Sequence, residues 1–176
     1  MGQGSRPLTT RTFAAWVEPV ARELREGRGE IARTARKFLP EMWTMPSPLE
    51  GWTYKDLLAH LATGDWVFQT MLRQTLGIEN ALPAQATLEF VNEGNARLLA
   101  ERKDTSIEEL IAEAEREGET TQELLSGLSD ANDPSAFVWH RPNGDPVTLE
   151  QWVTGFPRHD PSHLAQLKTA LDNVML

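Results

Sequence analysis

Two histidines four residues apart, His159 and His163, are the residues of this chain whose types and spacing could do chemistry. They stand at the head of an apolar pattern formed by Leu164, Leu167, Leu171 and Val174. Residues i and i+4 of an α-helix lie on one face, so both imidazoles could reach a single ion. A neutral imidazole that faces a protein core needs a hydrogen-bond partner or a metal. The pair therefore predicts either a metal site or a set of hydrogen-bonded core histidines.

A third histidine, His60, lies in an earlier helical pattern, three residues after Leu57, which places it on the inner face of that helix or at its edge. Helical bundles build metal sites from side chains on facing helices, and three histidines would leave coordination positions open for a reaction. The chain has no cysteine, so any metal must be held by histidine or carboxylate groups. The fourth histidine, His140, falls in a loop-like segment and is left outside the site.

Composition narrows the class of protein. The chain has 176 residues, 40% of them hydrophobic, which suits one globular domain over residues 1–176 with residues 1–11 as a flexible tail. The formal net charge of -9 argues against a nucleic-acid partner, which needs a basic surface, and favours a small-molecule substrate. No apolar run approaches the roughly 18 residues needed to span a membrane, and the N-terminus lacks a secretory apolar segment. The cytoplasm is the simplest location.

Four long helical patterns must position the histidines. They cover residues 12–43, 51–77, 86–130 and 149–174, and the third is expected in two pieces. The second pattern carries an apolar stripe of Leu57, Leu61, Phe68 and Leu72. Four such regions, with no repeat and no phosphate-binding loop, predict an all-α bundle.

Short polar signals mark where the helices begin. Thr53 and Asp56 have the spacing of a capping box, either Thr105 or Ser106 caps the later piece of the third pattern, and Thr148 caps the last pattern. The segment 133–150 contains an Asn143–Gly144 turn signal and reads as an ordered loop with a short strand at 137–140.

Prolines complicate the position of His159. Pro157 precedes the histidine pair and Pro161 lies between its members, and each removes an intrahelical hydrogen bond. The last helix is therefore expected to start at Pro161 with Asp160 as its N-cap, which would leave His159 outside the helix.

Two motifs give the chain a family resemblance. The stretch GWTYKDLLAHLATGDW, with Trp52, Asp56 and His60, and the stretch RHDPSHLAQL, with both later histidines, resemble motifs of the DinB-like superfamily. This superfamily includes thiol-dependent transferases and mycothiol-dependent maleylpyruvate isomerases. The resemblance implies an up-down-down-up four-helix bundle in which His60, His159 and His163 bind a divalent metal ion, typically nickel or zinc.

The resemblance also implies a class of function. A metal-dependent transferase or hydrolase would activate a low-molecular-weight thiol or a water for attack on a small electrophile. Asp56 could orient the free ring nitrogen of His60, or it could serve only as a capping carboxylate. The alternative is a metal-binding or stress-response module that binds small molecules without turnover. Homodimers are common in the superfamily, and one is expected here.

Overall fold

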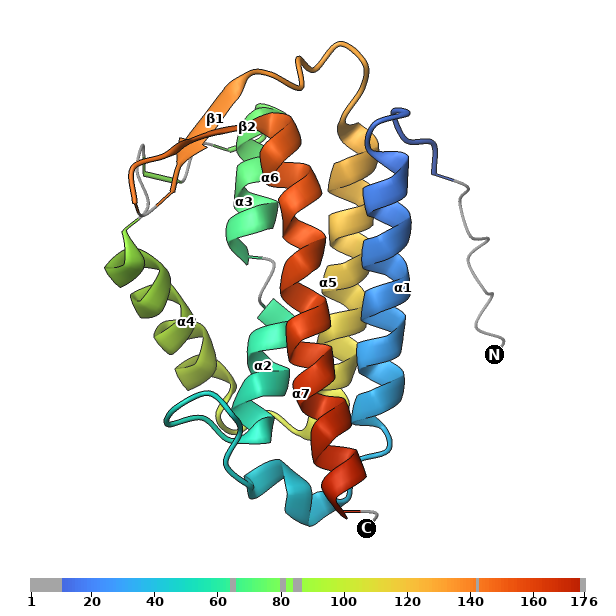
Figure 1. Cartoon of the computed structure of the whole chain (residues 1–176), viewed down its shortest axis with the longest axis vertical. Coiled ribbons are helices and arrows are strands. Elements are labelled where there is room, and N and C mark those ends of the chain that lie inside the picture. The colour runs from blue at the N-terminus through green and yellow to red at the C-terminus, as the bar shows by residue number, and fades with distance from the viewer. Residues whose placement is uncertain (1–10, 64–65, 80–81, 84–86, 142, 175–176) are drawn as a thin grey trace, which may run out of the picture.

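The helices of the computed structural model form a bundle whose members lie side by side along its long axis (Figure 1). The structure describes residues 11–63, 66–79, 82–83, 87–141 and 143–174. The bundle helices are α1 (Glu18–Ala35), α2 (Tyr54–Thr63) with α3 (Trp66–Thr75) above it, α5 (Ile107–Gly127), and α6 (Leu149–Gly155) continuing into α7 (His159–Val174). A short 3-10 helix, η1 (Pro40–Thr44), links α1 to α2.

The helices follow the predicted up-down-down-up order. In Figure 1, α1 and α7 run downward, whereas α2, α3 and α5 run upward. The two parallel neighbours α3 and α5 are connected by an outer helix, α4 (Leu88–Arg102), which returns the chain to the lower end. This long connection is what separates the topology from a simple bundle of antiparallel hairpins.

The second helical pattern is described in two pieces. α2 is described to Thr63 and α3 from Trp66, and the two residues between them lie outside the described part of the chain. The apolar stripe nevertheless runs through both helices, because Leu57, Leu61, Phe68 and Leu72 all have an exposed fraction of 0%. Burial of one continuous face keeps the two helices in a common column.

The predicted capping sites at Thr53–Asp56, Ser106 and Thr148 are confirmed. The backbone N–H of Thr53 donates to Asp56 Oδ2 (2.8 Å), and the backbone N–H of Asp56 donates to Thr53 Oγ1 (3.2 Å). α5 has Ser106 as its N-cap, with Glu109 completing a capping box, and Thr148 caps α6. The Asp56 carboxylate thus has the capping role that the sequence left open.

Substituting Asp56 with alanine is expected to lower the free energy of unfolding by about 1 kcal/mol, because the Thr53 N–H loses its acceptor. Thermal unfolding of the metal-free protein measures this loss, and Asp56→Glu, which keeps a carboxylate at the same position of the box, is the control. If Asp56 instead orients His60, the alanine variant would lose metal affinity while its unfolding temperature stayed near that of the wild type.

A β-hairpin lies above α6. β1 (Phe137–His140) pairs antiparallel with β2 (Pro146–Thr148), and Gly144 in the turn adopts a φ of +89°. The strand at 137–140 is confirmed, but the second strand was not predicted because it has only three residues and begins with proline. Pro146 is tolerated because the hairpin has two edges and needs no ladder N–H there.

The expectation that the last helix starts at Pro161 is wrong. A 3-10 turn, η2 (Phe156–Arg158), joins α6 to α7, and His159 is the first residue of α7. Both prolines sit in first turns, Pro157 in η2 and Pro161 in α7, where a missing N–H removes no intrahelical bond. The side chain of the proposed cap, Asp160, lies outside what the structure describes.

The inner face of α7 agrees with the predicted stripe except at its end. Leu164 and Leu167 are buried and Leu171 packs against the core, whereas Val174 is 42% exposed. At the other terminus, the predicted tail lies outside the described residues apart from Arg11, whose Nη1 lies 2.6 Å from Glu119 Oε2. Over the described part of the chain, every helix is too short or too polar to cross a membrane.

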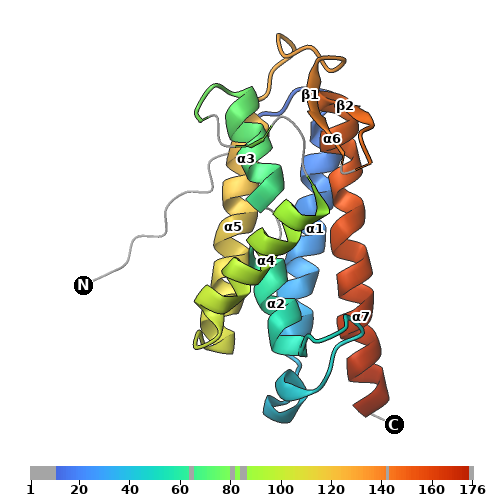
Figure 2. The same cartoon turned by 90° about the vertical axis from the view of Figure 1, so that its left-hand side faces the viewer.

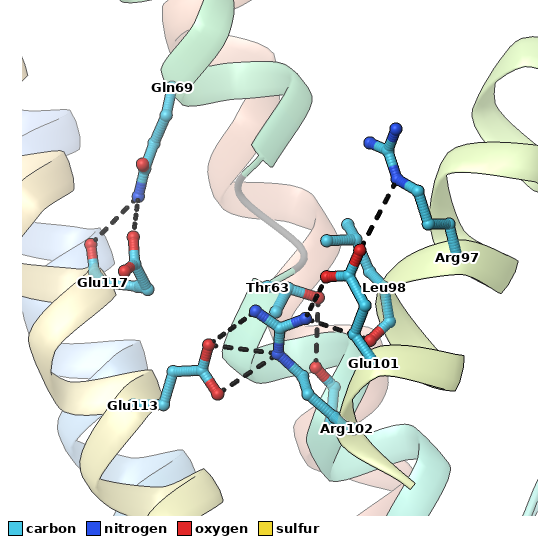
Figure 3. A network of polar contacts seen from close by, with 9 residues as sticks. Thr63, Gln69, Arg97, Leu98, Glu101, Arg102, Glu113 and Glu117 are labelled. Carbon is cyan, nitrogen blue, oxygen red and sulfur yellow. Dashed lines mark hydrogen bonds and ion pairs between the residues drawn. The ribbon is translucent and has the colours of Figure 1, made fainter.

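The outer helix α4 crosses α2 (Figure 2) and contacts the rest of the bundle through both apolar and polar side chains. All its residues are described, and Gly94 alone is buried. Near its C-terminus, Arg102 donates from Nη2 and Nε to Glu113 of α5, at 2.7 and 3.0 Å (Figure 3). Burial by itself would lower the pKa of Arg102, but hydrogen bonding and the charge of Glu113 outweigh it and raise that pKa. The ion pair fixes the lower end of α4 to the bundle.

Candidate metal centre

Three imidazoles from two helices converge on one point inside the bundle. The Nε2 atom of His159 lies 3.2 Å from Nε2 of His60 and 3.3 Å from Nε2 of His163. One nitrogen from each ring can be chosen so that all three lie within 4.8 Å of one another. His60 and His163 are each only 8% exposed, whereas His159 is half-buried. The group could hold one metal ion, and its approach from solvent is past His159.

Local structure explains why the rings meet. His60 lies in the second half of α2, and the four-residue spacing in α7 brings the other two rings together on the face that packs against α2. The ring centroids of His159 and His163 are 4.6 Å apart. The structure therefore brings together all three histidines singled out in the sequence, while His140 lies on β1 with its ring against Phe137.

Aromatic side chains surround the imidazoles. The Trp52 ring meets His60 edge-on, with centroids 5.2 Å apart, and Phe156 lies nearly parallel to His159 at 6.0 Å. Phe156 is itself stacked on Phe68 of α3, at 4.0 Å and an interplanar angle of 10°. Such contacts restrict ring rotation and reduce the access of water to the nitrogens.

Gln166 is the partner of the His163 ring on the side away from the other histidines. Its Oε1 lies 3.0 Å from His163 Nδ1, and because an amide oxygen can only accept, this contact is a hydrogen bond in the tautomer that carries the proton on Nδ1. Nε2 of His163 then directs a lone pair toward the other two rings, as a metal ligand must. Sequence reasoning did not assign this role. The signal was the i, i+3 spacing of His163 and Gln166, which puts both side chains on one side of the helix.

The nitrogen spacing fits a metal better than shared hydrogen bonds. Two nitrogens bound tetrahedrally at about 2.0–2.1 Å from an ion are roughly 3.3–3.4 Å apart, which is close to the two Nε2 separations that involve His159. In the alternative, Nε2 of His159 holds either a proton or a lone pair, so it can make a full hydrogen bond with at most one neighbouring Nε2. One ion would satisfy all three atoms together.

Changing Gln166 to alanine should weaken metal binding by roughly 10- to 100-fold, the usual cost of removing the group that orients a histidine ligand. Competition with a chromogenic chelator measures the affinity. Gln166→Glu, which keeps an acceptor oxygen, should bind at least as tightly as the wild type. Equal affinities in the alanine variant and the wild type would show that Gln166 does not orient the ligand.

A comparison with models of known protein families gives a match for this chain. The model of the mycothiol maleylpyruvate isomerase N-terminal domain matches residues 24–156, a span that contains His60 and ends three residues before His159. No curated protein matches the chain.

Solved structures share the fold. The chain resembles the mycothiol-dependent maleylpyruvate isomerase with a TM-score of 0.68 and 19% identity, over 86% of this chain and 60% of that one. It resembles YfiT from Bacillus subtilis, described as a probable metal-dependent hydrolase with an unusual four-helix bundle topology, with a TM-score of 0.70 and 15% identity over 99% and 93% of the two chains. A candidate DinB-family member from Exiguobacterium sibiricum gives 0.55 and 16%, over 92% and 93%.

These identities are low enough that the solved structures bear on the fold alone, and the chain spans only 60% of the isomerase. The family model, by contrast, matches residues 24–156, which is most of the chain. The chain therefore belongs to the mycothiol maleylpyruvate isomerase N-terminal domain family.

Proposed function

We propose that this protein is a metal-dependent transferase or hydrolase in which His60, His159 and His163 hold one divalent ion, nickel or zinc. The convergence of three Nε2 atoms carries the proposal. Neutral imidazole suits both metals, and the absence of cysteine leaves no thiolate to compete for the ion. When bound, such an ion lowers the pKa of a thiol or a water, so that the nucleophilic anion exists at neutral pH.

The chain's own residues would prepare the site for this chemistry. Gln166 holds the proton of His163 on Nδ1 and leaves Nε2 available as a ligand. Trp52 and Phe156 limit water on two sides of the histidines. His159, the more exposed of the three, marks the side from which a small electrophile would enter.

The choice between a thiol and water as nucleophile rests on the family. A mycothiol-dependent isomerase is among the structural relatives, and a probable hydrolase is another. Because the chain covers only part of the isomerase, the proposal does not extend to that enzyme's reaction. We favour a low-molecular-weight thiol as the nucleophile or co-substrate. The expected homodimer stays a prediction, which light scattering of the purified protein would test.

The test is metal content followed by turnover. Untagged protein, loaded with nickel or zinc, is expected to hold about one ion per chain by mass spectrometry. It should accelerate conjugation of a thiol to 1-chloro-2,4-dinitrobenzene or hydrolysis of 4-nitrophenyl acetate, and His60→Ala should abolish the acceleration with its helical content unchanged. A protein that keeps its ion but turns over no substrate would favour a binding module, and a protein that takes up no ion would refute the proposal.

A further inference from the structure

A cavity lies between α3 and α4, and no histidine lines it. Its volume is about 500 Å³, within the range of small-molecule sites. We call this space the aromatic cavity. The residues that line it are Trp66, Thr70, Leu82, Phe90, Glu93, Gly94 and Arg97. None of them belongs to the candidate metal centre. The cavity is thus separate from the site to which the proposed function refers.

The principal wall of the aromatic cavity is a fixed indole. The Nε1–H of Trp66 donates to Asn95 Oδ1 at 3.1 Å, which holds the ring against α4. A Cβ atom at position 94 would clash with Cζ2 of Trp66 and lie only 2.7 Å from its Cη2, so a glycine is required there. Glycine within a helix is unfavourable relative to alanine. Gly94 is nevertheless the one buried residue of α4, all of which is described, and its small size is what allows the indole to lie where it does.

The other walls suit a flat ring. The Phe90 ring lies 5.7 Å from Trp66, with an interplanar angle of 53°, and the Leu82 side chain is 9% exposed. The two rings therefore present a tilted pair of aromatic surfaces to the cavity, already held in place. Aromatic ligands gain both apolar burial and favourable ring contacts from such surfaces.

The charges at the rim indicate what the ligand should not carry. Glu93 and Arg97 are exposed, have opposite signs and lie four residues apart on α4. Arg97 already has an acidic neighbour, Glu101, whose Oε1 is 3.9 Å from its Nε. A charged ligand would lose hydration in the apolar interior without a matching net charge in return. An uncharged ring would lose little.

We propose that the aromatic cavity binds a flat, uncharged aromatic molecule of one or two rings. None of the three histidines lines the aromatic cavity, so this proposal does not depend on the proposed function. Occupation by such a molecule would bring a ring against Trp66 and Phe90 and leave the exposed rim charges in water.

The test follows the indole N–H of Trp66 by NMR, with that signal assigned through Trp66→Phe, during titration with 2-naphthol. The expected result is a saturable shift of this signal, with a Kd on the order of millimolar or tighter. The anionic analogue 2-naphthoate should bind at least roughly tenfold more weakly, since its charge must be desolvated. Equal or tighter binding of 2-naphthoate would overturn the assignment of an uncharged ligand.

Two variants locate the site. Thr70→Leu, which adds apolar volume to the wall, should weaken 2-naphthol binding at least roughly tenfold, as should Gly94→Ala, which displaces the indole. If Gly94→Ala fails to fold, Thr70→Leu still decides the question. His163→Ala should bind 2-naphthol as well as the wild type. Binding unchanged in Thr70→Leu would refute the site, and so would a Trp66 shift that follows protein concentration without probe, because a second copy would then occupy the cavity.

Discussion

Replacing His159 with alanine is expected to deprive the protein of its metal ion. Its Nε2 lies within 3.3 Å of Nε2 in both other histidines, so it is central to the group. Loss of a group that merely orients a ligand costs roughly 10- to 100-fold in affinity, and loss of a ligand should cost at least as much. Metal content after dialysis, measured by mass spectrometry, should fall from about one ion per chain to near zero. His140→Ala, which removes the histidine on β1, should retain the ion.

His163→Ala should have the same effect as His159→Ala. From the sequence, Pro161 suggested that His159 was held loosely and that its removal would only weaken binding. The structure changes this expectation, because His159 lies within α7 and stacks beside Phe156. An ion retained equally in both variants would eliminate the site. If only His159→Ala retained the ion, His159 would not be a ligand, and His60 and His163 would bind the ion together with other groups.

Phe68→Ala should lower the free energy of unfolding by about 3–5 kcal/mol, as is usual when a buried phenylalanine is truncated. Phe68 has an exposed fraction of 0% and is stacked on Phe156. For a chain of this size the loss corresponds to a fall of roughly 10 °C in unfolding temperature. Thermal and urea denaturation of the metal-free protein would measure it.

The same substitution should also weaken metal binding, since Phe156 loses its support and lies against His159. Leu125→Ala is the matched control. Leu125 is fully buried on α5 in the same hydrophobic cluster, so its truncation should destabilise the protein by a comparable amount. Under conditions where both variants are folded, only Phe68→Ala should lose affinity. Equal affinities would show that the aromatic stack does not position His159.

Much of the fold could be predicted from local pattern. Apolar residues at helical spacing, with a threonine or serine at the start, identified the bundle helices and three capping sites. These patterns involve residues that are close together in the chain, so they can be recognised from the sequence alone. The same is true of the convergence of the histidines, because their spacing in α7 and the place of His60 on α2 required only that the two helices pack together.

The features that were missed depend on distant or compensating contacts. β2 depends on pairing with β1 and has only three residues, of which the first is proline. The prolines beside His159 read as a helix break, although both lie in first turns where their missing N–H groups cost nothing. Gln166 became visible only when its oxygen was seen next to His163.

The separation of the histidines along the chain has a consequence for biosynthesis. His60 and His159 are 99 residues apart, and at typical translation rates the second is made roughly 5 to 20 s after the first. The helix α1, made earlier still, rests against α7 in the finished bundle. A growing chain therefore carries an incomplete core and an incomplete set of imidazoles until α7 leaves the ribosome. The three imidazoles can meet only after α7 has been made, and until then the inner faces of α1 and α2 lack the helix that covers them.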